Sequence, residues 1–446
     1  MKHTFSRRAF LQRALLASAG LTFAGCDKAP RRRTVSPSGT ILHASIGAGG
    51  MAASDLNSLA HHPFVKVVAI SDVEIAKAEN WKERFPGVRI YQDWRKLLEQ
   101  EKELDSLNVS TPDHMHAPIA MSAMQLGRHV YVQKPLAHDI FEVRQLTRFA
   151  RERNLVTQMG IQIHSLEEYR LAVRLVRDGA IGKVKEVHTW SDKDWGNPNP
   201  KPDRTDPVPA GFDWDGWLGV AAERPFIGDG YYHPGNWRRI LDFGTGTFGD
   251  MGCHIYDPVF NALALTAPLS VRSEGAAPNP WHWASNALIR YLFPGTPYTA
   301  DPTVKVTWYD GTQRPPREVQ ALLGDEKLPG QGSIFVGTGG VLLLPHISKP
   351  RLLPQEKFTG FKMPAVEGGN HYTLFLEAVR GNGKTTAGFD YSGPLTETVL
   401  LGGVASRFPQ TTLQWDSTAL RFRNVAEANS YLRRTYRKGW QVKGLS

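Results

Sequence analysis

The first part of the chain is patterned as apolar strands separated by helical segments. Helical spacing of apolar residues is clear over 117–126, between two of the apolar runs. Strands joined by helices in this order are typical of a parallel sheet, whose ligands lie beyond the carboxyl ends of its strands. The predicted strands are 41–46, 65–72, 104–109, 129–132 and 155–164.

The pattern changes in the second part of the chain. An amphipathic helix is predicted over 166–177, ended by Gly179, and a strand follows over 184–190. The later strand-like runs have few helices between them, which favours a largely antiparallel sheet. These runs include "LSVRSEG", "PTVKVTWYDG" and "GSIFVGTGGVLLL".

The composition is that of an ordinary globular protein, with 41% hydrophobic and 22% charged residues among 446. The formal net charge of +10 looks at first like a nucleic-acid signal. However, residues 1–33 hold eight Lys and Arg residues against one Asp, a net charge of +7, so +3 remains for the rest of the chain. The folded body is nearly balanced in charge, which gives no basis for a nucleic-acid partner.

Residues 1–39 have the pattern of a targeting segment followed by a linker. "SRRAFLQ" carries a twin arginine, and the apolar run after it is too short to span a bilayer, so together they resemble a twin-arginine export signal. "LTFAGC" also resembles a lipoprotein cleavage box with Cys26 as the lipidated residue, although Phe23 stands where Leu is usual. The alternative is ordinary peptidase cleavage nearby. We expect export to the periplasm, with or without a lipid anchor, and no intrachain disulfide, because Cys253 is the other cysteine.

A glycine-rich turn joins the first predicted strand to the helix after it. The turn reads Gly47-Ala48-Gly49-Gly50-Met51-Ala52, a G-x-G-x-x-A pattern in which backbone amides at the helix N-terminus can approach a pyrophosphate. Asp72 ends the second strand, 20 positions after Ala52, where a carboxylate can accept a hydrogen bond from a ribose hydroxyl. An acid there favours NAD over NADP, whose 2′-phosphate it would repel. The alternative is an aspartate that only caps the next helix.

The turn and the strand pattern together predict an α/β fold with a Rossmann dinucleotide-binding domain over 40–164 and a C-terminal α+β domain over 165–446. Residues at the carboxyl ends of parallel strands are candidates for contact with a cofactor. In this chain they are Asn108, Thr111, Pro112, His116 and Lys134.

The second half also holds candidate residues. The stretch "GDMGCHIYD" places Asp250 and His254 four positions apart. On a helix such a pair faces one side, whether the two side chains contact a substrate or only each other. Seven of the twelve tryptophans lie between Trp190 and Trp283, interleaved with Pro, Asp and Asn. Aromatic faces beside polar groups suit sugar rings, although tryptophans that anchor long loops would give the same composition.

Four motifs in sequence order resemble those of the Gfo/Idh/MocA oxidoreductase family. "GAGGMA" alone is weakly specific, "STPDHMHAPIA" and "VQKPL" are more so, and "DMGCHIYD" matches the family's D-x-x-x-H. The tracts "FDWDGWLG" and "WRRILDFGTG" resemble the exported, saccharide-acting branches. The resemblance covers the chain from about residue 40 and implies a Rossmann domain followed by an open, largely antiparallel sheet, which carries the substrate site and often an oligomer interface.

The resemblance also implies roles for single residues. Lys134 would bridge the nicotinamide ribose and the substrate, Asp250 would hold a substrate hydroxyl, and His254 would be the acid/base. Oxidation of a secondary alcohol needs hydride transfer and loss of the hydroxyl proton, for which an imidazole and a nearby ammonium are suited. The family usually has Glu before the lysine, and Gln133 replaces it here, so the adjacent acid is lost. The residues predicted to hold the dinucleotide are Gly47, Gly49, Gly50, Met51, Asp72, Asn108, Thr111, Pro112, His116 and Lys134.

Other polar and aromatic residues have weaker signals. Trp237, Tyr231 and His233 are candidates for contact with substrate, whereas His138 and His164 are better explained as polar or capping residues. No metal site is predicted, because the histidines of "HMH" lie beside a proline-bounded turn and lack a third ligand.

Three functions are consistent with these residues. The first is an NAD(P)-dependent oxidoreductase that acts on a secondary hydroxyl of a sugar, glycoside or cyclitol. The second is an NAD-dependent glycosidase, in which oxidation, elimination and re-reduction form a closed cycle on tightly bound NAD. The third is a non-catalytic, surface-tethered sugar-binding protein, against which the intact glycine, lysine and histidine positions weigh. We expect a small carbohydrate as partner, no nucleic acid, membrane contact only through a lipid anchor, and a homo-oligomer.

Overall fold

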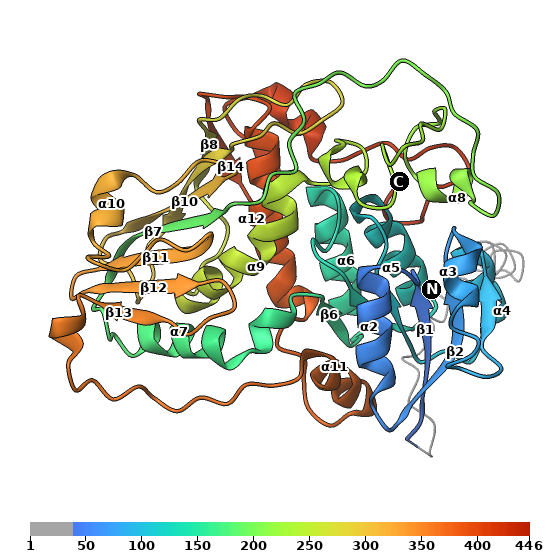
Figure 1. Cartoon of the computed structure of the whole chain (residues 1–446), viewed down its shortest axis with the longest axis horizontal. Helices are drawn as coiled ribbons and strands as arrows, with labels where there is room; N and C mark the ends of the chain where they lie inside the picture. The colour runs from blue at the N-terminus through green and yellow to red at the C-terminus, as the bar shows by residue number, and fades with distance from the viewer. Residues whose placement is uncertain (1–38) are drawn as a thin grey trace, which may run out of the picture. The chain divides into compact units, whose positions relative to one another are not determined.

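The N-terminal part of the chain contains one sheet of six parallel strands. The structure is a computed structural model that describes residues 39–446, so the predicted export signal and Cys26 lie outside the described part of the chain. The strand order β3-β2-β1-β4-β5-β6 is that of a Rossmann fold (Figure 1). The strands are β1 (Ile41–Ile46), β2 (Val65–Ser71), β3 (Arg89–Tyr91), β4 (Ser106–Val109), β5 (His129–Val132) and β6 (Thr157–Met159).

The predicted strands of this sheet agree with the structure to within two residues, except at the last one. The strand predicted over 155–164 is only three residues long. Gly160 follows it, at a position where a Cβ would lie 2.8 Å from the side chain of Gln133, and the chain then turns into a 3-10 helix at Gln162–Ser165. The turn that replaces the second half of the predicted strand brings Gln162 to the main cavity described below.

Helices cover both faces of the parallel sheet. Ile41 and Tyr131 point to the face covered by α2 and α11, where Leu59 and Phe375 complete the contact. Val130, next to Tyr131 in the strand, points the other way into the core beneath α5 and α6. Because α11 comes from the last quarter of the sequence, the C-terminal part of the chain closes one face of the N-terminal sheet (Figure 1). These helices are α2 (Met51–Ala60), α3 (Ile75–Glu79), α4 (Trp94–Gln100), α5 (His116–Gln125), α6 (Ile140–Glu152) and α11 (His371–Arg380).

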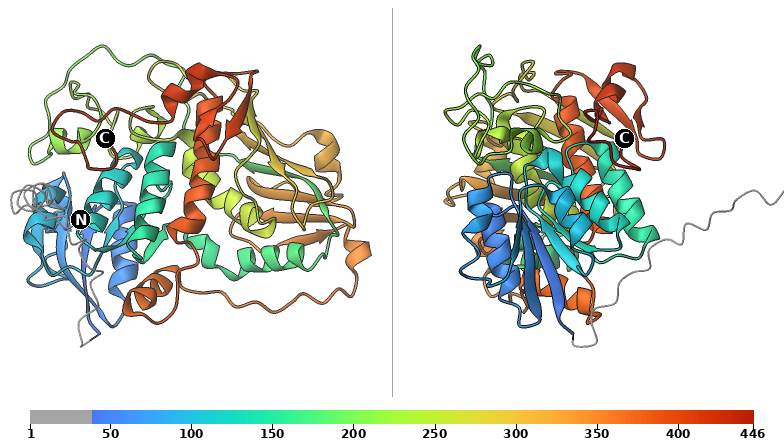
Figure 2. Two further views of the ribbon diagram at one scale, coloured as in Figure 1. Left: turned by 180° about the vertical axis from the view of Figure 1, so that it is seen from behind. Right: turned by 90° about the vertical axis from the view of Figure 1, so that its right-hand side faces the viewer.

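The second sheet has nine strands in the order β13-β12-β11-β7-β10-β9-β8-β14-β15. It lies on the right-hand side of the left view in Figure 2. Only the pair β7 and β10 is parallel, so the prediction of a largely antiparallel sheet is confirmed. The strands are β7 (Val184–Ser191), β8 (Ser270–Ser273), β9 (Leu288–Pro294), β10 (Thr303–Asp310), β11 (Gln331–Gly337), β12 (Val341–Pro345), β13 (Arg351–Leu353), β14 (Thr412–Asp416) and β15 (Arg421–Phe422).

One helix, α9, connects the second sheet to the rest of the fold. It packs on β7, β10 and β11 on one side and on α7 and α12 on another, and α12 also packs on α6 of the first domain (Figure 1). None of the helices described for residues 39–446 is both long and apolar enough to cross a membrane. The helices of this part are α7 (Glu167–Arg177), α8 (Trp214–Leu218), α9 (Gly246–Ala262), α10 (Arg317–Ala321) and α12 (Phe389–Ala405).

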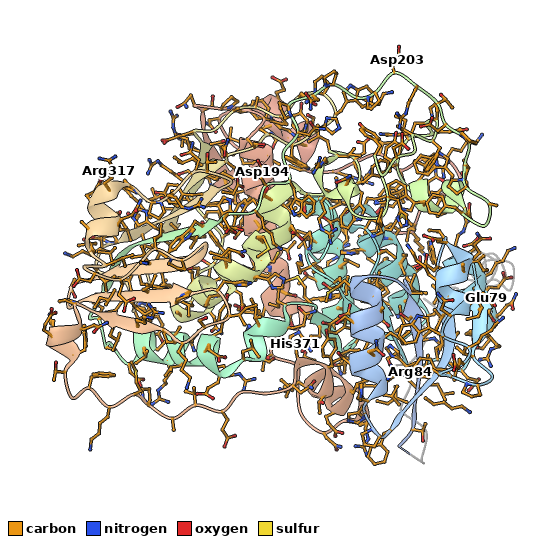
Figure 3. All side chains as sticks on the ribbon, viewed as in Figure 1. Glu79, Arg84, Asp194, Asp203, Arg317 and His371 are labelled. Atoms are coloured by element: carbon orange, nitrogen blue, oxygen red, sulfur yellow. The ribbon has the colours of Figure 1, made fainter. Side chains whose placement is uncertain are left out.

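A long and mostly irregular segment, residues 192–245, joins β7 to α9. Asp194 marks its start and Asp203 its outermost stretch in Figure 3. The segment then returns to the first sheet, where the backbone N–H of Asp213 donates to the carbonyl oxygen of Val73 at 2.8 Å. Trp217 and Trp237 of this segment are buried in a hydrophobic cluster within it, and the segment is held against the edge of the first sheet.

Candidate functional site

A cavity of about 530 Å³ opens at the carboxyl edge of the first sheet, between that edge, the segment 192–245 and α9. The glycine turn after β1 and Asp72 after β2 both line it. Lys134, Asp250 and His254 line it as well. Most of the residues predicted to bind a dinucleotide and to act on a substrate therefore face one common space.

The turn between β1 and α2 leaves room for a close ligand. Gly47 has a φ of +103°, and a Cβ there would lie 2.6 Å from the carbonyl oxygen of Ser110. A Cβ on Gly49 would lie 2.7 Å from the side chain of Lys77, whereas one on Gly50 would meet open space. Helix α2 starts with no side-chain cap, which leaves amides of its first turn for a phosphate group. These features fit the pyrophosphate of a dinucleotide.

Asp72 faces the cavity and also braces the turn. Its Oδ2 accepts from the backbone N–H of Ala48 at 2.8 Å, and its Oδ1 accepts from that of Glu74 at 2.9 Å. Burial raises the pKa of Asp72, while the two backbone hydrogen bonds and the charge of Lys77 oppose the rise. The carboxylate thus fixes the chain at the entry to α3 and remains exposed to a ligand in the cavity.

Lys134 and Asp250 form an ion pair across the two domains. The Nζ of Lys134 lies 2.6 Å from Oδ1 of Asp250 and 2.7 Å from its carbonyl oxygen. The two side chains are only 14% and 9% exposed. Because one residue follows β5 and the other lies in α9, the ion pair fixes the ammonium of Lys134 at the wall of the cavity.

Asp250 is surrounded by donors and positive charges. Trp195 Nε1 donates to its Oδ2 at 2.8 Å, Arg238 Nε lies 3.3 Å from its Oδ1, and Lys193 Nζ lies 4.0 Å from its Oδ2. Burial alone would raise the pKa of Asp250, but the charges of Lys134 and Arg238 hold it well below its usual range. The carboxylate is therefore ionised at neutral pH and can accept a hydrogen bond from a hydroxyl group.

His254 lies one helical turn after Asp250 on α9. Its Nδ1 is buried and has no hydrogen-bond partner in the described part of the chain. Burial, together with the charge of Lys134, lowers the pKa of His254 well below 6.5. The imidazole is therefore neutral near pH 7, which is the state that can accept a proton.

The remaining predicted residues divide into two groups. Asn108 is buried and hydrogen-bonded to His43, His116 contacts two backbone carbonyl oxygens through its ring nitrogens, and the hydroxyl of Tyr231 contacts His282. Asn108, His116 and Tyr231 do not line the cavity. The predicted residues that do line it are Gly47, Gly49, Gly50, Met51, Asp72, Thr111, Pro112, Lys134, His233, Trp237, Asp250 and His254.

Sequence reasoning missed several polar residues of the cavity, among them Lys77, Lys193, Arg238 and His346. Arg238 follows Trp237 directly and stacks on its ring at 4.3 Å, so a cation beside an aromatic residue was the available signal. Lys193 and His346 come shortly after the ends of β7 and β12. Strand ends of the second sheet therefore also carry cavity residues.

The side chain of Gln133, which stands directly before Lys134, is bonded to a buried carboxylate, that of Asp55 in α2. Asp55 is fully buried and accepts hydrogen bonds from Gln133 Nε2 at 2.9 Å, Ser110 Oγ at 2.7 Å and the Tyr372 hydroxyl at 2.8 Å. Burial raises the pKa of Asp55, and these hydrogen bonds oppose the rise. Residue 133 is therefore bonded to a carboxylate, while the carboxylate that pairs with Lys134 itself is that of Asp250.

Replacing Asp55 by asparagine should lower the free energy of unfolding by about 2 kcal/mol. A carboxamide has one acceptor oxygen in place of two, so at least one neighbouring donor would face an NH₂ group. Urea denaturation measures the change. Asp178→Asn is the matched control, because Asp178 is an exposed acid paired with Arg174 on α7, and its replacement should change stability by less than about 0.5 kcal/mol. Equal stability of Asp55→Asn and the wild type would contradict this prediction.

Two family descriptions match the chain. "Oxidoreductase family, NAD-binding Rossmann fold" matches residues 41–161, and "Oxidoreductase family, C-terminal alpha/beta domain" matches residues 182–290, which together are just over half of the chain. The chain belongs to the Gfo/Idh/MocA oxidoreductase family. In this Gfo/Idh/MocA protein the first match contains the six parallel strands, and the second contains α9 with Asp250 and His254.

Curated relatives resemble parts of this Gfo/Idh/MocA protein. Levoglucosan dehydrogenase of Pseudarthrobacter phenanthrenivorans is 29% identical over 133 residues, which are 30% of this chain and 33% of that protein. The dTDP-3,4-didehydro-2,6-dideoxy-alpha-D-glucose 3-reductase of Streptomyces antibioticus is 30% identical over 152 residues, 34% of this chain and 46% of that protein. A glycosyl hydrolase family 109 protein of Shewanella putrefaciens is 26% identical over 206 residues, 41% of this chain and 45% of that protein. Each similarity spans less than half of the relative's length.

Solved structures share the fold over most of the chain. The WlbA dehydrogenase from Bordetella pertussis, in complex with NADH and UDP-GlcNAcA, has a TM-score of 0.59 at 14% identity and covers 84% of this chain and 99% of that chain. The aldose-aldose oxidoreductase from Caulobacter crescentus, complexed with glycerol, has a TM-score of 0.54 at 15% identity and covers 84% and 100%. At such low identity the likeness shows the fold alone.

Proposed function

We propose that this Gfo/Idh/MocA protein is an NAD-dependent oxidoreductase that acts on a secondary hydroxyl of a sugar, glycoside or cyclitol. The observation that carries the proposal is that Lys134, Asp250 and His254 meet in the same cavity that the glycine turn lines. A bound nicotinamide supplies the acceptor or donor of the hydride. The protein then has to hold the reacting hydroxyl and move its proton.

The three residues can divide this task among them. The ammonium of Lys134, held by Asp250, can stabilise negative charge on the hydroxyl oxygen as its proton leaves. The ionised carboxylate of Asp250 can accept a hydrogen bond from a hydroxyl of the substrate. The neutral imidazole of His254 can take the proton, and it can return a proton when the reaction runs toward the alcohol.

The walls of the cavity suit a sugar ring. Trp195 and Trp237 line it beside Asp250, and the guanidinium of Arg238 lies 5.4 Å and 4.3 Å from the centres of these two rings. A flat apolar face next to charged side chains can hold the C–H face of a sugar and its hydroxyl groups at the same time. A sugar or sugar derivative stands in the names of the levoglucosan dehydrogenase and the dTDP-sugar reductase, which supports this class of substrate.

We further propose that NAD is held tightly. His233 Nε2 lies 3.0 Å from both Lys77 Nζ and Glu74 Oε2, and the stem of Lys77 lies against Gly49. The backbone of residues 211–213 is bonded to the connection between β2 and α3 close by. The segment 192–245 thus lies along the side of the cavity where the glycine turn lies, and we expect its contacts to slow the release of a bound dinucleotide.

A retained cofactor favours the second candidate function, a glycosidase with a closed redox cycle. In such a cycle a sugar ring is oxidised, the aglycone is eliminated and the ring is reduced again, so that no external oxidant is needed. The name of the glycosyl hydrolase family 109 relatives supports this candidate. The export that we propose from residues 1–39 suits it too, because the twin-arginine route carries folded proteins with their cofactors.

The experiment that tests the proposal is to denature the purified full-length protein and identify the released nucleotide by mass spectrometry. We expect about one NAD per chain. A panel of glycosides then separates the two enzymes, because a closed cycle releases aglycone without a net change of nicotinamide redox state, whereas a dehydrogenase accumulates reduced nicotinamide and oxidised sugar. A protein that is empty and also fails to bind added NAD would refute both functions and leave the sugar-binding protein. Release of NADP in place of NAD would contradict the argument from Asp72.

A further inference from the structure

A second cavity, of about 320 Å³, lies behind the start of α9. It shares no lining residue with the cavity that holds Asp250. Its walls come from the start of α6, the first turn of α9, the end of α12 and the C-terminal segment near residue 431. The polar and aromatic side chains discussed below that line it are His138, Trp283, Arg407, Tyr431 and Arg434.

Arg407 brings a positive charge into this cavity. The centre of its guanidinium group lies 4.5 Å from the centre of the Tyr431 ring and 5.3 Å from that of the Trp283 ring. Burial lowers the pKa of Arg407, and the nearby Tyr431 and Asp242 oppose the change. The guanidinium is hydrogen-bonded to Tyr431 but forms no ion pair within residues 39–446, so several of its five N–H donors remain for a ligand.

Two further nitrogen atoms in the wall are buried without a partner among the described residues, Arg434 Nε and His138 Nε2. Arg434 uses one terminal nitrogen on the carbonyl oxygen of Asp242 at 3.1 Å. The ring of His138 is hydrogen-bonded on its other side to the backbone of Leu241, and burial lowers the pKa of His138 well below 6.5. One open donor and one open acceptor therefore remain, and each is unfavourable when buried unless a ligand pairs with it.

The carboxylates at this cavity already have partners. Asp139 accepts from the backbone N–H groups of Glu142 and Arg434, and Asp242 pairs with Arg224. Helix α9 begins here with no side-chain cap, so the positive end of its dipole adds to the charge of the arginines. The cavity therefore offers an excess of positive charge next to two aromatic rings.

We propose that this second cavity binds a small hydroxylated organic anion, a sugar acid or a sugar phosphate. Arg407 and Arg434 would donate to its carboxylate or phosphate oxygens, and His138 Nε2 would accept from a hydroxyl group. Trp283 and Tyr431 would pack against its carbon skeleton. The site stands apart from the proposed reaction, since no residue of the substrate cavity takes part in it.

The position of the site links it to the reaction centre. Thr245 and Gly249 line it and directly flank the first turn of α9, and Asp250 follows Gly249 in the chain. Thr245 Oγ1 also donates to Asp113, whose side chain faces the first cavity. An occupant of the second cavity therefore contacts the helix that carries Asp250 and His254, and we expect it to change the rate of turnover.

The test is isothermal titration calorimetry on the full-length protein loaded with NAD. The ligands are two organic anions, gluconate and glucose 6-phosphate, which distinguish a carboxylate from a phosphate ligand. Glucitol is their uncharged counterpart, and inorganic phosphate is the control for an anion without a carbon skeleton. We expect saturable binding of at least one organic anion and none of glucitol at this site. Arg407→Gln should weaken that binding at least tenfold. Arg153→Gln is the matched control, because Arg153 also stacks on an aromatic ring, that of Phe149 at 5.3 Å, and it should leave binding unchanged.

The fluorescence of Trp283 gives a second measurement that does not depend on the stability of an arginine variant. Binding of the anion should change the fluorescence of the wild type, and Trp283→Phe should remove this change. Three results would overturn the proposal. The first is binding that survives in Arg407→Gln but is lost in Asp250→Asn, because this assigns the ligand to the first cavity. The second is binding of inorganic phosphate alone, which indicates an adventitious ion only. The third is the absence of binding of either organic anion.

Discussion

Replacing Lys134 by methionine should lower kcat by about a thousandfold. The ammonium lies 2.6 Å from Asp250 and is 14% exposed, so its charge acts in a site that is largely shielded from water. Loss of one fixed donor to a developing oxyanion typically lowers kcat by about 10²- to 10³-fold, and here the donor is charged. Methionine retains most of the apolar stem. The absorbance of the bound nicotinamide in a single turnover measures the effect.

The control for this variant is Lys193→Met. Lys193 lines the same cavity, but its side chain is 46% exposed and its Nζ lies 4.0 Å from Asp250, so we expect less than a tenfold change in kcat. The affinity for sugar, measured by calorimetry, should change far less than kcat in Lys134→Met. Turnover of Lys134→Met within tenfold of the wild type would contradict the role given to this lysine.

Replacing His254 by glutamine should also lower kcat by about 10³, within the range found for loss of a general acid or base. Glutamine keeps the polarity and the approximate size of the side chain, so α9 should keep its packing. The second histidine of the cavity, His346, is the control, since its Nδ1 is already hydrogen-bonded to the Tyr169 hydroxyl at 2.8 Å. His346→Gln should therefore reduce kcat by much less than His254→Gln, and equal losses would contradict the assignment.

The pH dependence of the wild type tests the same residue. Burial and the charge of Lys134 lower the pKa of His254 well below 6.5, because both disfavour the charged imidazolium. Oxidation needs the neutral imidazole, so kcat/KM should hold as the pH falls to 6.5 and decline only at more acidic pH. In Lys134→Met one repelling charge is gone, and the decline in residual activity should move to higher pH. A wild-type decline above pH 6.5 would refute this argument.

Much of the first domain could be predicted because its signals are local. Strand β1 has the bounds that its apolar run indicates, and the glycine turn follows it directly. The spacing of Asp250 and His254 indicates one face of a helix, and α9 places both on one cavity. Such features depend on residues that are close together in the sequence, so a pattern along the chain is enough to indicate them.

The rest of the site depends on contacts between distant parts of the sequence. Asp55 and Tyr372 are 317 positions apart, yet their hydrogen bond helps to complete the environment of Gln133. His346 reaches the cavity from the turn after β12, and no local pattern shows that this turn lies near α9. Conversely, Asn108 and His116 stand where strand-end residues bind ligands, but the side chain of Asn108 is bonded to those of His43 and Ser110, and the ring of His116 contacts two backbone carbonyl oxygens.

The attachment of residues 211–213 to the edge of the first sheet bears on how the protein is made. Under the proposed tight binding, a dinucleotide would reach the glycine turn before this stretch pairs with Val73 and Ile75, and filling the site would be a step of maturation. The choice between NAD and NADP would then be made once, from the nucleotide pool of the compartment where the chain folds rather than of the place where the protein finally works.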